Sequence, residues 1–259
     1  MATIATSKGV IGVLETGSGD AAPIIFLHGV GSDKRVWAPQ LAHFGGSRRA
    51  LAFDYPGYGE SEPAVGATRD DFAAAMFTAM DALGVGKAHI CGLSLGGVIG
   101  IAMHAAGPER CASLILADTF AVHPEGEAIY QRSVEASRTV GMRALAEGRV
   151  DALLGSAAAP ELRVEVVETM SAIDPESYRS GAEAVWLADQ RQRAATIDVP
   201  VLILVGEEDR ITPPVLSDEL AELIPQARLV RIPRAGHLAN AEQPHAFNRA
   251  VEEFLADLS

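Results

Sequence analysis

The sequence predicts an α/β protein with a mostly parallel central sheet flanked by helices, and two observations lead to this prediction. Short β-rich runs alternate with stretches of helical periodicity over residues 1–119, which is typical of parallel strands joined by helical crossovers. The alternation stops over residues 120–195 and resumes over residues 196–259. We therefore expect one sheet built from both ends of the chain, with a helical cap inserted between its sixth and seventh strands.

The first part of the predicted core, residues 1–119, supplies six expected strands and three expected helices. Apolar and β-branched runs predict the strands, and apolar residues at helical spacing predict the helices. The first two strands can pair across the turn formed by Ser7, Lys8 and Gly9. The expected strands are residues 3–6, 10–15, 23–27, 49–53, 88–91 and 113–117, and the expected helices are residues 34–44, 70–83 and 95–106.

The predicted cap, residues 120–195, contains no convincing strand. It is rich in Ala, Glu, Arg and Met and is interrupted by prolines and glycines, so we expect about four short helices. The second part of the core, residues 196–259, is expected to hold strands at residues 200–205 and 228–232 and helices at residues 214–224 and 244–258. A cap in this position would cover the carboxyl edge of the sheet, where ligands bind in open α/β folds.

Charge and composition disfavour several kinds of partner. The 34 acidic residues outnumber the 21 basic ones, and the net charge of -13 argues against nucleic acid and anionic membranes. We expect Cys91 and Cys111 to be buried free thiols, because both lie in or beside apolar strand-like runs. The first residues lack the pattern of a signal peptide, and no apolar run approaches the roughly 20 residues that span a bilayer. We therefore expect a cytoplasmic protein without a membrane partner.

Ser94 lies in the sequence Gly92-Leu93-Ser94-Leu95-Gly96, between a predicted strand and a predicted helix. A serine on so tight a turn presents its hydroxyl at the carboxyl end of the sheet, and the glycines are needed because a side chain would clash in the bend. The N–H of Leu95, which opens the helix, is free to donate to an anion beside Ser94. The pentapeptide alone could also be a glycine-rich turn that only packs.

Asp209 and His237 complete a candidate catalytic triad in the chain order Ser, Asp, His. A serine hydroxyl needs a base within hydrogen-bond reach, and that base needs an orienting acid. Asp209 and His237 both follow predicted strands, so the sheet would bring the three residues to one edge. Each also has a structural alternative, Asp209 as a helix N-cap and His237 as a satisfied loop histidine. Asp118, at the end of an earlier strand, is a second candidate for the acid.

The run His28-Gly29-Val30-Gly31 follows a predicted strand and offers a second oxyanion donor. Its glycines let the backbone approach the site closely, so the N–H of Val30 would donate alongside that of Leu95. We expect His28 to support this loop structurally. The remaining histidines lack metal-ligand spacing and the chain lacks a dinucleotide fingerprint, so we expect neither a metal nor a cofactor.

Together these motifs resemble the α/β-hydrolase superfamily over nearly the whole chain. The matching segments are residues 28–31, 54–61, 92–97, the loop around Asp209, and residues 235–237. The resemblance implies the α/β-hydrolase fold, an acyl-enzyme on Ser94 and a small-molecule ester or lactone as substrate. A serine at position 94, where dehalogenases and epoxide hydrolases carry aspartate, disfavours those two activities.

Within the superfamily the chain most resembles 3-oxoadipate enol-lactonases, through residues 91–100, 212–214 and 236–244. This resemblance implies a lactonase. A broad carboxylesterase and an acyl-homoserine-lactone hydrolase share much of the same pattern. A C–C bond hydrolase and a non-catalytic ligand receptor of the same fold are further alternatives.

The cap should set the substrate, because it would roof the pocket. Apolar residues that could line the pocket, or equally pack inside the cap, are Trp186, Met142, Leu145 and Tyr130. A substrate with a carboxylate would require an arginine, and the arginines considered in the cap are Arg132, Arg138, Arg143, Arg191 and Arg193. The apolar cap helices would suit a homodimer interface as well as a lid.

Overall fold

An eight-stranded sheet with the order β1-β2-β4-β3-β5-β6-β7-β8 organises the computed structural model, which describes residues 2–258. β1 pairs with β2 and β2 with β4 in antiparallel fashion, and every other neighbouring pair is parallel. The mostly parallel sheet predicted from the sequence is therefore confirmed. The strands are β1 Ala2–Thr6, β2 Gly9–Thr16, β3 Ile24–Leu27, β4 Ala50–Phe53, β5 Ala88–Leu93, β6 Cys111–Ala117, β7 Val201–Gly206 and β8 Arg228–Ile232.

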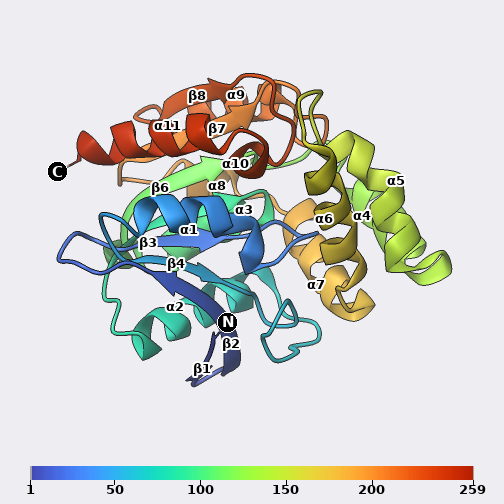
Figure 1. The fold of residues 1–259 in the computed structure, drawn as a ribbon, viewed down its shortest axis with the longest axis horizontal. Coiled ribbons are helices and arrows are strands. Elements are labelled where there is room, and N and C mark those ends of the chain that lie inside the picture. The colour runs from blue at the N-terminus through green and yellow to red at the C-terminus, as the bar shows by residue number, and fades with distance from the viewer. Residues whose placement is uncertain (1, 259) are drawn as a thin grey trace.

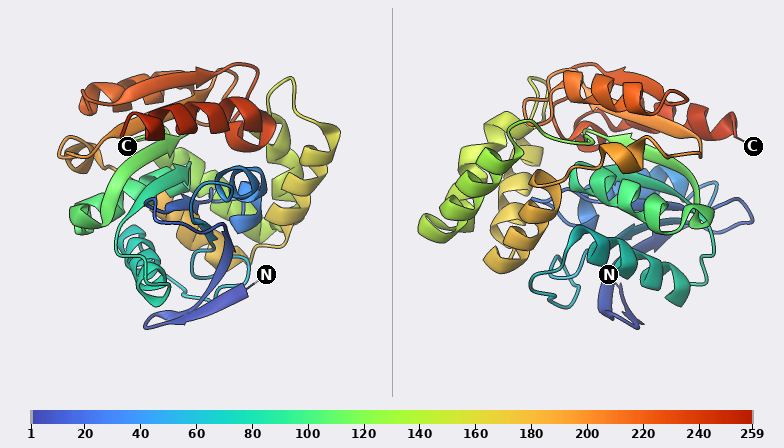
Figure 2. Two further views of the ribbon diagram at one scale, coloured as in Figure 1. Left: turned by 60° about the vertical axis from the view of Figure 1, so that its left-hand side comes forward. Right: turned by 180° about the vertical axis from the view of Figure 1, so that it is seen from behind.

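Helices cover both faces of this sheet (Figures 1 and 2). Successive strand residues face opposite sides, so Ile24 and Phe26 pack with α1 and α11, whereas Ile25 and Leu27 belong to the core shared with α2, α3 and α9. The bounds are α1 Ala38–Phe44, α2 Arg69–Ala82, α3 Leu95–Ala106, α9 Pro214–Leu223, α10 Ala239–Glu242 and α11 Pro244–Ala256, with 3-10 turns at η1 Lys34–Trp37 and η2 Pro108–Arg110.

The expected helix over residues 34–44 is divided in two. Residues 34–37 form the 3-10 turn η1, and α1 begins at Ala38. Pro39 lies in the first turn of α1 and has no N–H to donate to residue 35, so a continuous α-helix cannot pass through it.

The segment between β6 and β7 is helical, and we refer to it as the inserted segment. It contains α4 Gly126–Thr139, α5 Gly141–Leu153, α6 Pro160–Ser171, α7 Pro175–Trp186 and the short α8 Arg191–Ala194. Its two ends meet, because Val122 and Asp189 form an isolated β-bridge and the Gln190 N–H donates to the Ala121 carbonyl at 2.8 Å. Figure 1 shows α4 to α7 gathered beyond one end of the sheet rather than over its faces. No helix among residues 2–258 has the length and apolar character needed to cross a membrane.

Candidate active site

Ser94 lies on a strained turn between β5 and α3. Its φ is 55° and its ψ is -113°, a conformation that costs a non-glycine residue about 1–3 kcal/mol. Close packing holds the turn, since a Cβ added at Gly96 would lie 2.1 Å from the Leu27 carbonyl oxygen. The Ser94 N–H donates to the Ala117 carbonyl at 2.9 Å, and Thr119 Oγ1 donates to the Ser94 carbonyl at 2.8 Å. Both ends of the turn are thus tied to the end of β6 and the loop after it.

The Ser94 side chain opens on a cavity of about 310 Å³ whose lining includes Val30, Trp186 and His237. Ser94 Oγ is buried and has no hydrogen-bond partner within residues 2–258. The structure therefore brings Ser94 and His237 to one cavity but contains no bond between them. Such contacts are often long before substrate binds and tighten in the complex.

Asp209 and His237 are in direct contact. Asp209 Oδ2 lies 2.8 Å from His237 Nδ1, and both side chains are buried. The second oxygen of Asp209 accepts the N–H groups of Ile211 at 2.7 Å and Thr212 at 2.9 Å, and the Thr212 hydroxyl donates to Oδ2 at 2.7 Å. A proton on Nδ1 faces the carboxylate, which leaves Nε2 as the basic nitrogen of His237.

The charge of Asp209 is stabilised by these contacts. Burial by itself would raise the pKa of Asp209, but the charge and hydrogen bond of His237 and the hydrogen bonds from Thr212 outweigh burial and lower that pKa. The carboxyl is therefore ionised near neutral pH and can orient an imidazole.

Asp118, the other candidate for the acid, does not contact His237. Its Oδ1 accepts the N–H of Gly206 at 2.7 Å, and its Oδ2 is buried without a partner among the described residues. Burial and the nearby charge of Asp209 raise the pKa of Asp118 well above its ordinary value. We therefore interpret Asp118 as a structural carboxyl that fixes the end of β7, where the Asp209 loop begins.

Replacing Asp118 with asparagine should be tolerated, because an amide keeps the acceptor for Gly206 and removes a charge that burial disfavours. Replacement with alanine should cost about 1–3 kcal/mol of unfolding free energy, since it leaves a buried N–H without a partner. The pKa of Asp118 is raised in the folded state. The free energy of unfolding of the wild type should therefore fall relative to that of the asparagine variant as pH rises above the ordinary pKa of aspartate. Urea unfolding of the three proteins at about pH 4 and pH 8 measures both effects, and an asparagine variant as unstable as the alanine variant would contradict them.

Val30 and Leu95, which we expect to be the oxyanion donors, have backbone N–H groups near Ser94. A Cβ added at Gly29 would lie 3.5 Å from Ser94 Cβ, so the backbone of this loop runs beside the serine. Leu95 is the first residue of α3, whose opening N–H groups have no partner within the helix. The N–H of Val30 has no acceptor in the described part of the chain. Two free donors therefore flank Ser94.

His28 stabilises this loop through hydrogen bonds. Its Nδ1 donates to the Gly29 carbonyl at 2.8 Å and its Nε2 accepts the N–H of Tyr55 at 3.4 Å, which requires the neutral ring. Burial lowers the pKa of His28, in agreement with an uncharged ring. The ring also packs 4.5 Å from the ring of Tyr55 and 5.2 Å from that of Tyr58.

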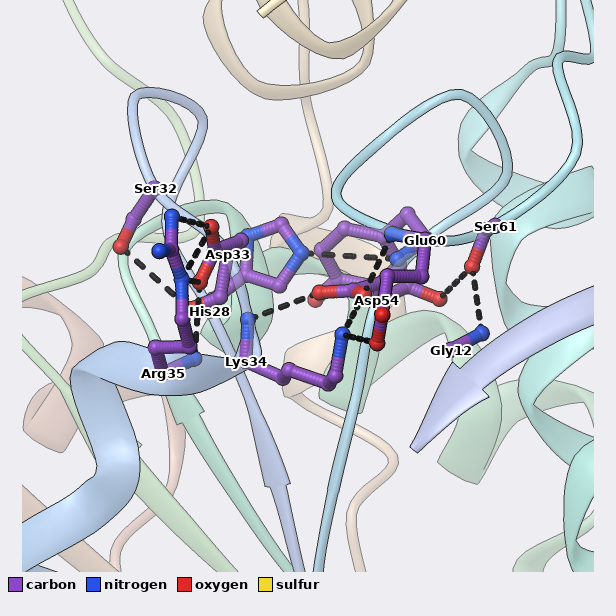
Figure 3. A network of polar contacts seen from close by, with 10 residues as sticks. Gly12, His28, Ser32, Asp33, Lys34, Arg35, Asp54, Glu60 and Ser61 are labelled. Carbon is purple, nitrogen blue, oxygen red and sulfur yellow. Dashed lines mark hydrogen bonds and ion pairs between the residues drawn. The ribbon is translucent and has the colours of Figure 1, made fainter. Parts of the chain in front are cut away.

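A buried ion pair anchors the same region, as Figure 3 shows. Lys34 Nζ contacts the carboxylate of Asp54 and lies 2.9 Å from Glu60, while the Lys34 N–H donates to Asp54 Oδ1 at 2.8 Å. Lys34 and Asp54 are 2% and 0% exposed. Gly59, with φ +53°, is required here because a Cβ would lie 2.2 Å from the Asp54 carboxylate. This pair ties the loop after β3 to the loop after β4.

Replacing Lys34 with methionine should lower the free energy of unfolding by about 3–5 kcal/mol, because it leaves the Asp54 carboxylate buried and unpaired. Replacing Arg163, whose partner Asp151 is exposed, removes a surface pair and should cost about 0–1 kcal/mol. Urea unfolding of both variants measures the difference. Equal losses would show that burial of the Lys34 pair has no energetic consequence.

The cavity lining differs from the sequence expectation. Of the four apolar residues proposed, Trp186 lines the cavity beside Ser94. Met142 is buried in the core cluster, Tyr130 packs against that cluster, and Leu145 lines a second cavity of about 680 Å³. Helix α5 turns Met142 and Leu145 away from the serine, and α6 supplies Leu162, Val166 and Met170 in their place.

The cap arginines considered from the sequence do not reach the cavity that holds Ser94. Arg143 and Arg193 pair with Glu168 and Asp70. Arg132 lines the second cavity. Arg138 pairs with Glu176, and Arg191 with Asp189.

Sequence reasoning missed Arg149, which lines the serine cavity together with Leu153. No local pattern distinguished it from the other arginines of this segment, because the difference lies in their ion pairs.

The sequence and the structure are both similar to those of known proteins. A family model described as an alpha/beta hydrolase family matches residues 24–250. The chain is 31% identical over 242 residues to 3-oxoadipate enol-lactonase 2 of Acinetobacter baylyi, which covers 91% of this chain and 89% of that protein. The solved enol-lactonase of Burkholderia xenovorans LB400 superposes with a TM-score of 0.92 at 30% identity, over 98% of this chain and 100% of that one. A thermophilic esterase of Thermogutta terrifontis superposes with a TM-score of 0.91, also at 30% identity, over 99% and 98%.

Proposed function

The chain belongs to the alpha/beta hydrolase family, and on that premise we propose that it is a serine hydrolase that cleaves a small carboxylic ester or lactone through an acyl-enzyme on Ser94. The observation that carries the proposal is the contact of Asp209 with His237 at 2.8 Å, with His237 sharing the cavity of Ser94. The names of the relatives above support an enol-lactonase-like activity as the finer proposal.

In the proposed mechanism His237 Nε2 takes the proton of Ser94 as Oγ attacks the substrate carbonyl carbon. Asp209 holds the imidazolium that forms, and the N–H groups of Val30 and Leu95 donate to the tetrahedral oxyanion. His237 then gives its proton to the leaving oxygen, and the carbon–oxygen bond of the ester breaks. In a lactone this oxygen stays attached to the acyl chain as a hydroxyl.

Water completes the cycle. His237 takes a proton from a water molecule as its oxygen attacks the acyl carbon, and the collapse of the second tetrahedral intermediate returns that proton to Ser94 Oγ. The cavity is lined on one side by the strand-end loops and on the other by α5, α6 and Trp186. We propose that these helices act as a cap that selects the acyl group.

The test is steady-state hydrolysis of a substrate panel by the wild type and by Ser94→Ala. The panel contains short p-nitrophenyl esters, simple γ-lactones, an acyl-homoserine lactone and the enol-lactone of 3-oxoadipate. A strong preference for one lactone, lost in the variant, supports the lactonase proposal, and rapid cleavage of many esters supports a broad carboxylesterase. Absence of Ser94-dependent turnover on every member would reject the serine hydrolase in favour of C–C bond hydrolysis or a ligand receptor.

A further inference from the structure

Arg149 is a cation without a counter-charge in the proposed active site. It lies on α5, is half-buried, and lines the cavity that holds Ser94, Trp186 and His237. Its Nη1 donates to the hydroxyls of Tyr178 at 2.9 Å and Ser133 at 3.3 Å. The guanidinium also lies over the indole of Trp186, with its central carbon 5.8 Å from the ring centroid. All three partners are uncharged.

Most other arginines of the inserted segment have a counter-charge, whereas Arg149 has none among the described residues. Six of the arginines of the inserted segment form ion pairs with carboxylates, and these are Arg138, Arg143, Arg163, Arg179, Arg191 and Arg193. Arg149 has no ion pair within residues 2–258, although acids outnumber bases in the chain by 34 to 21. A partly desolvated charge is costly unless an opposite charge meets it. An anion supplied by a ligand would provide this opposite charge.

The lining of the second cavity carries more positive than negative charge. Arg132 and Arg210 line the second cavity, which Arg149 and Trp186 also border, and neither forms an ion pair with a described residue. Glu125 lines that second cavity too. On the serine side the charged lining residues are Arg35, which is bound by Asp33, and the exposed Glu165.

The geometry of the guanidinium fits a carboxylate. Arginine carries five N–H donors, and the two hydrogen bonds to hydroxyls both come from Nη1. Nε and Nη2 make no hydrogen bond to the described residues, and this edge is the one that binds a carboxylate through two parallel bonds. Tyr178, Ser133 and the indole restrict the rotation of the guanidinium, so little ordering remains to be done when a ligand binds.

We propose that Arg149 determines substrate specificity by binding a carboxylate on the acyl part of the substrate, at the end away from the carbonyl that Ser94 attacks. The preferred substrates are then half-esters of short dicarboxylic acids, or lactones that bear a carboxylate. The proposal rests on the proposed serine hydrolase function, and it assigns the acyl selectivity of that site to one residue. The aliphatic side chains of α5 and α6 that line the cavity would contact the carbon chain of the substrate between its carbonyl and its carboxylate.

The test compares charged and neutral acyl groups of equal length. The substrates are the mono-p-nitrophenyl esters of succinate through pimelate, each matched by its methyl-capped diester, with spontaneous hydrolysis subtracted. Wild type should prefer the charged member at one chain length. In Arg149→Met, KM for that charged substrate should rise about 10- to 100-fold, as expected for loss of a hydrogen bond to a charged group, with kcat and the neutral substrate within about threefold. Arg149→Lys, which keeps the charge but loses the planar fork, should be intermediate.

Arg143→Met is the matched control. It removes an arginine from the same helix, but Arg143 pairs with Glu168 at the surface and lines neither cavity. Its kinetics should equal those of wild type on both substrates. Equal activity of wild type on the charged and neutral esters, or equal loss on both in Arg149→Met, would overturn the proposal while leaving the serine mechanism standing.

A binding measurement keeps the two proposals separate. Calorimetric titration with the free dicarboxylates requires no turnover, and wild type should bind one of them about 10- to 100-fold more tightly than Arg149→Met does. If Ser94→Ala hydrolyses the esters as fast as wild type but this difference in binding is present, the serine mechanism fails and the carboxylate site stands. If no dicarboxylate binds wild type more tightly than Arg149→Met, the carboxylate site is rejected.

Discussion

Replacing Ser94 with alanine should lower kcat by several orders of magnitude, up to about 10⁶, because the nucleophile is lost while the oxyanion donors remain. The fold should be unaffected. Ser94 Oγ makes no hydrogen bond to the described residues, so its removal leaves no partner unsatisfied. The backbone bonds that hold the turn, from the Ser94 N–H to Ala117 and from Thr119 to the Ser94 carbonyl, do not involve the hydroxyl.

Two measurements check this expectation. Single-turnover and steady-state rates on the best ester of the panel give the loss in kcat, and circular dichroism with thermal unfolding tests the fold. Alanine keeps the Cβ that strains the turn, so the melting temperature should stay close to that of wild type. A variant with wild-type turnover would show that another group carries the acyl chain.

Replacing Asp209 with asparagine should lower kcat by about 10⁴, the effect of losing the acid that orients the histidine in serine hydrolases. An amide group facing Nδ1 favours the wrong tautomer of His237, so Nε2 carries the proton and cannot act as a base. The amide can still accept the N–H groups of Ile211 and Thr212 through its oxygen. The loss should therefore fall mainly on catalysis, with a smaller loss of stability from the missing charge.

Because the pKa of Asp209 is lowered, the free energy of unfolding should depend on pH in a predictable direction. The ionised carboxylate stabilises the folded state above about pH 3.9, the ordinary value for aspartate, and this contribution is lost as pH falls through the lower folded pKa. The asparagine variant lacks this contribution. The gap in unfolding free energy between the two proteins should therefore narrow below about pH 4, which urea titrations can follow.

The same variants distinguish the two acids considered from the sequence. If Asp118 orients His237, then Asp118→Asn should lose activity and Asp209→Asn should keep it. The contact of Asp209 with His237, and the raised pKa of Asp118, predict the opposite result.

Local chemistry in the sequence predicted much of the fold and the approach of the three proposed triad residues to one edge of the sheet. Apolar strand runs and helical spacing are short-range signals, and the helix expected at residues 95–106 is α3 with those bounds. Ser94, Asp209 and His237 each follow a strand, and parallel strands end at one edge, so the sheet alone brings them close. Pro39 also marks the break between η1 and α1 in the sequence. The prediction of one continuous helix followed the helical pattern of the surrounding residues and gave this single proline too little weight.

The cavity lining could not be predicted in the same way. Whether Met142 or Leu145 faces the serine depends on how α5 rotates against its neighbours in the inserted segment, which is set by contacts between helices distant in sequence. The Lys34–Asp54 pair is likewise non-local, since 20 residues separate its members. Arg149 could be recognised as special only once the ion pairs of the surrounding arginines were visible.

The order of the strands has a consequence for how the chain folds during its synthesis. β6 and β7 lie side by side, yet the inserted segment separates them in the sequence, so we expect their pairing, which closes a long loop, to follow the pairing of the earlier strands. Domains form from the N-terminus during synthesis, and Ser94 reaches its turn while Asp209 and His237 are still to be made. A nascent or truncated chain therefore carries the serine without the means to activate it. Any hydrolytic activity should then appear only when β7 and β8 join the sheet.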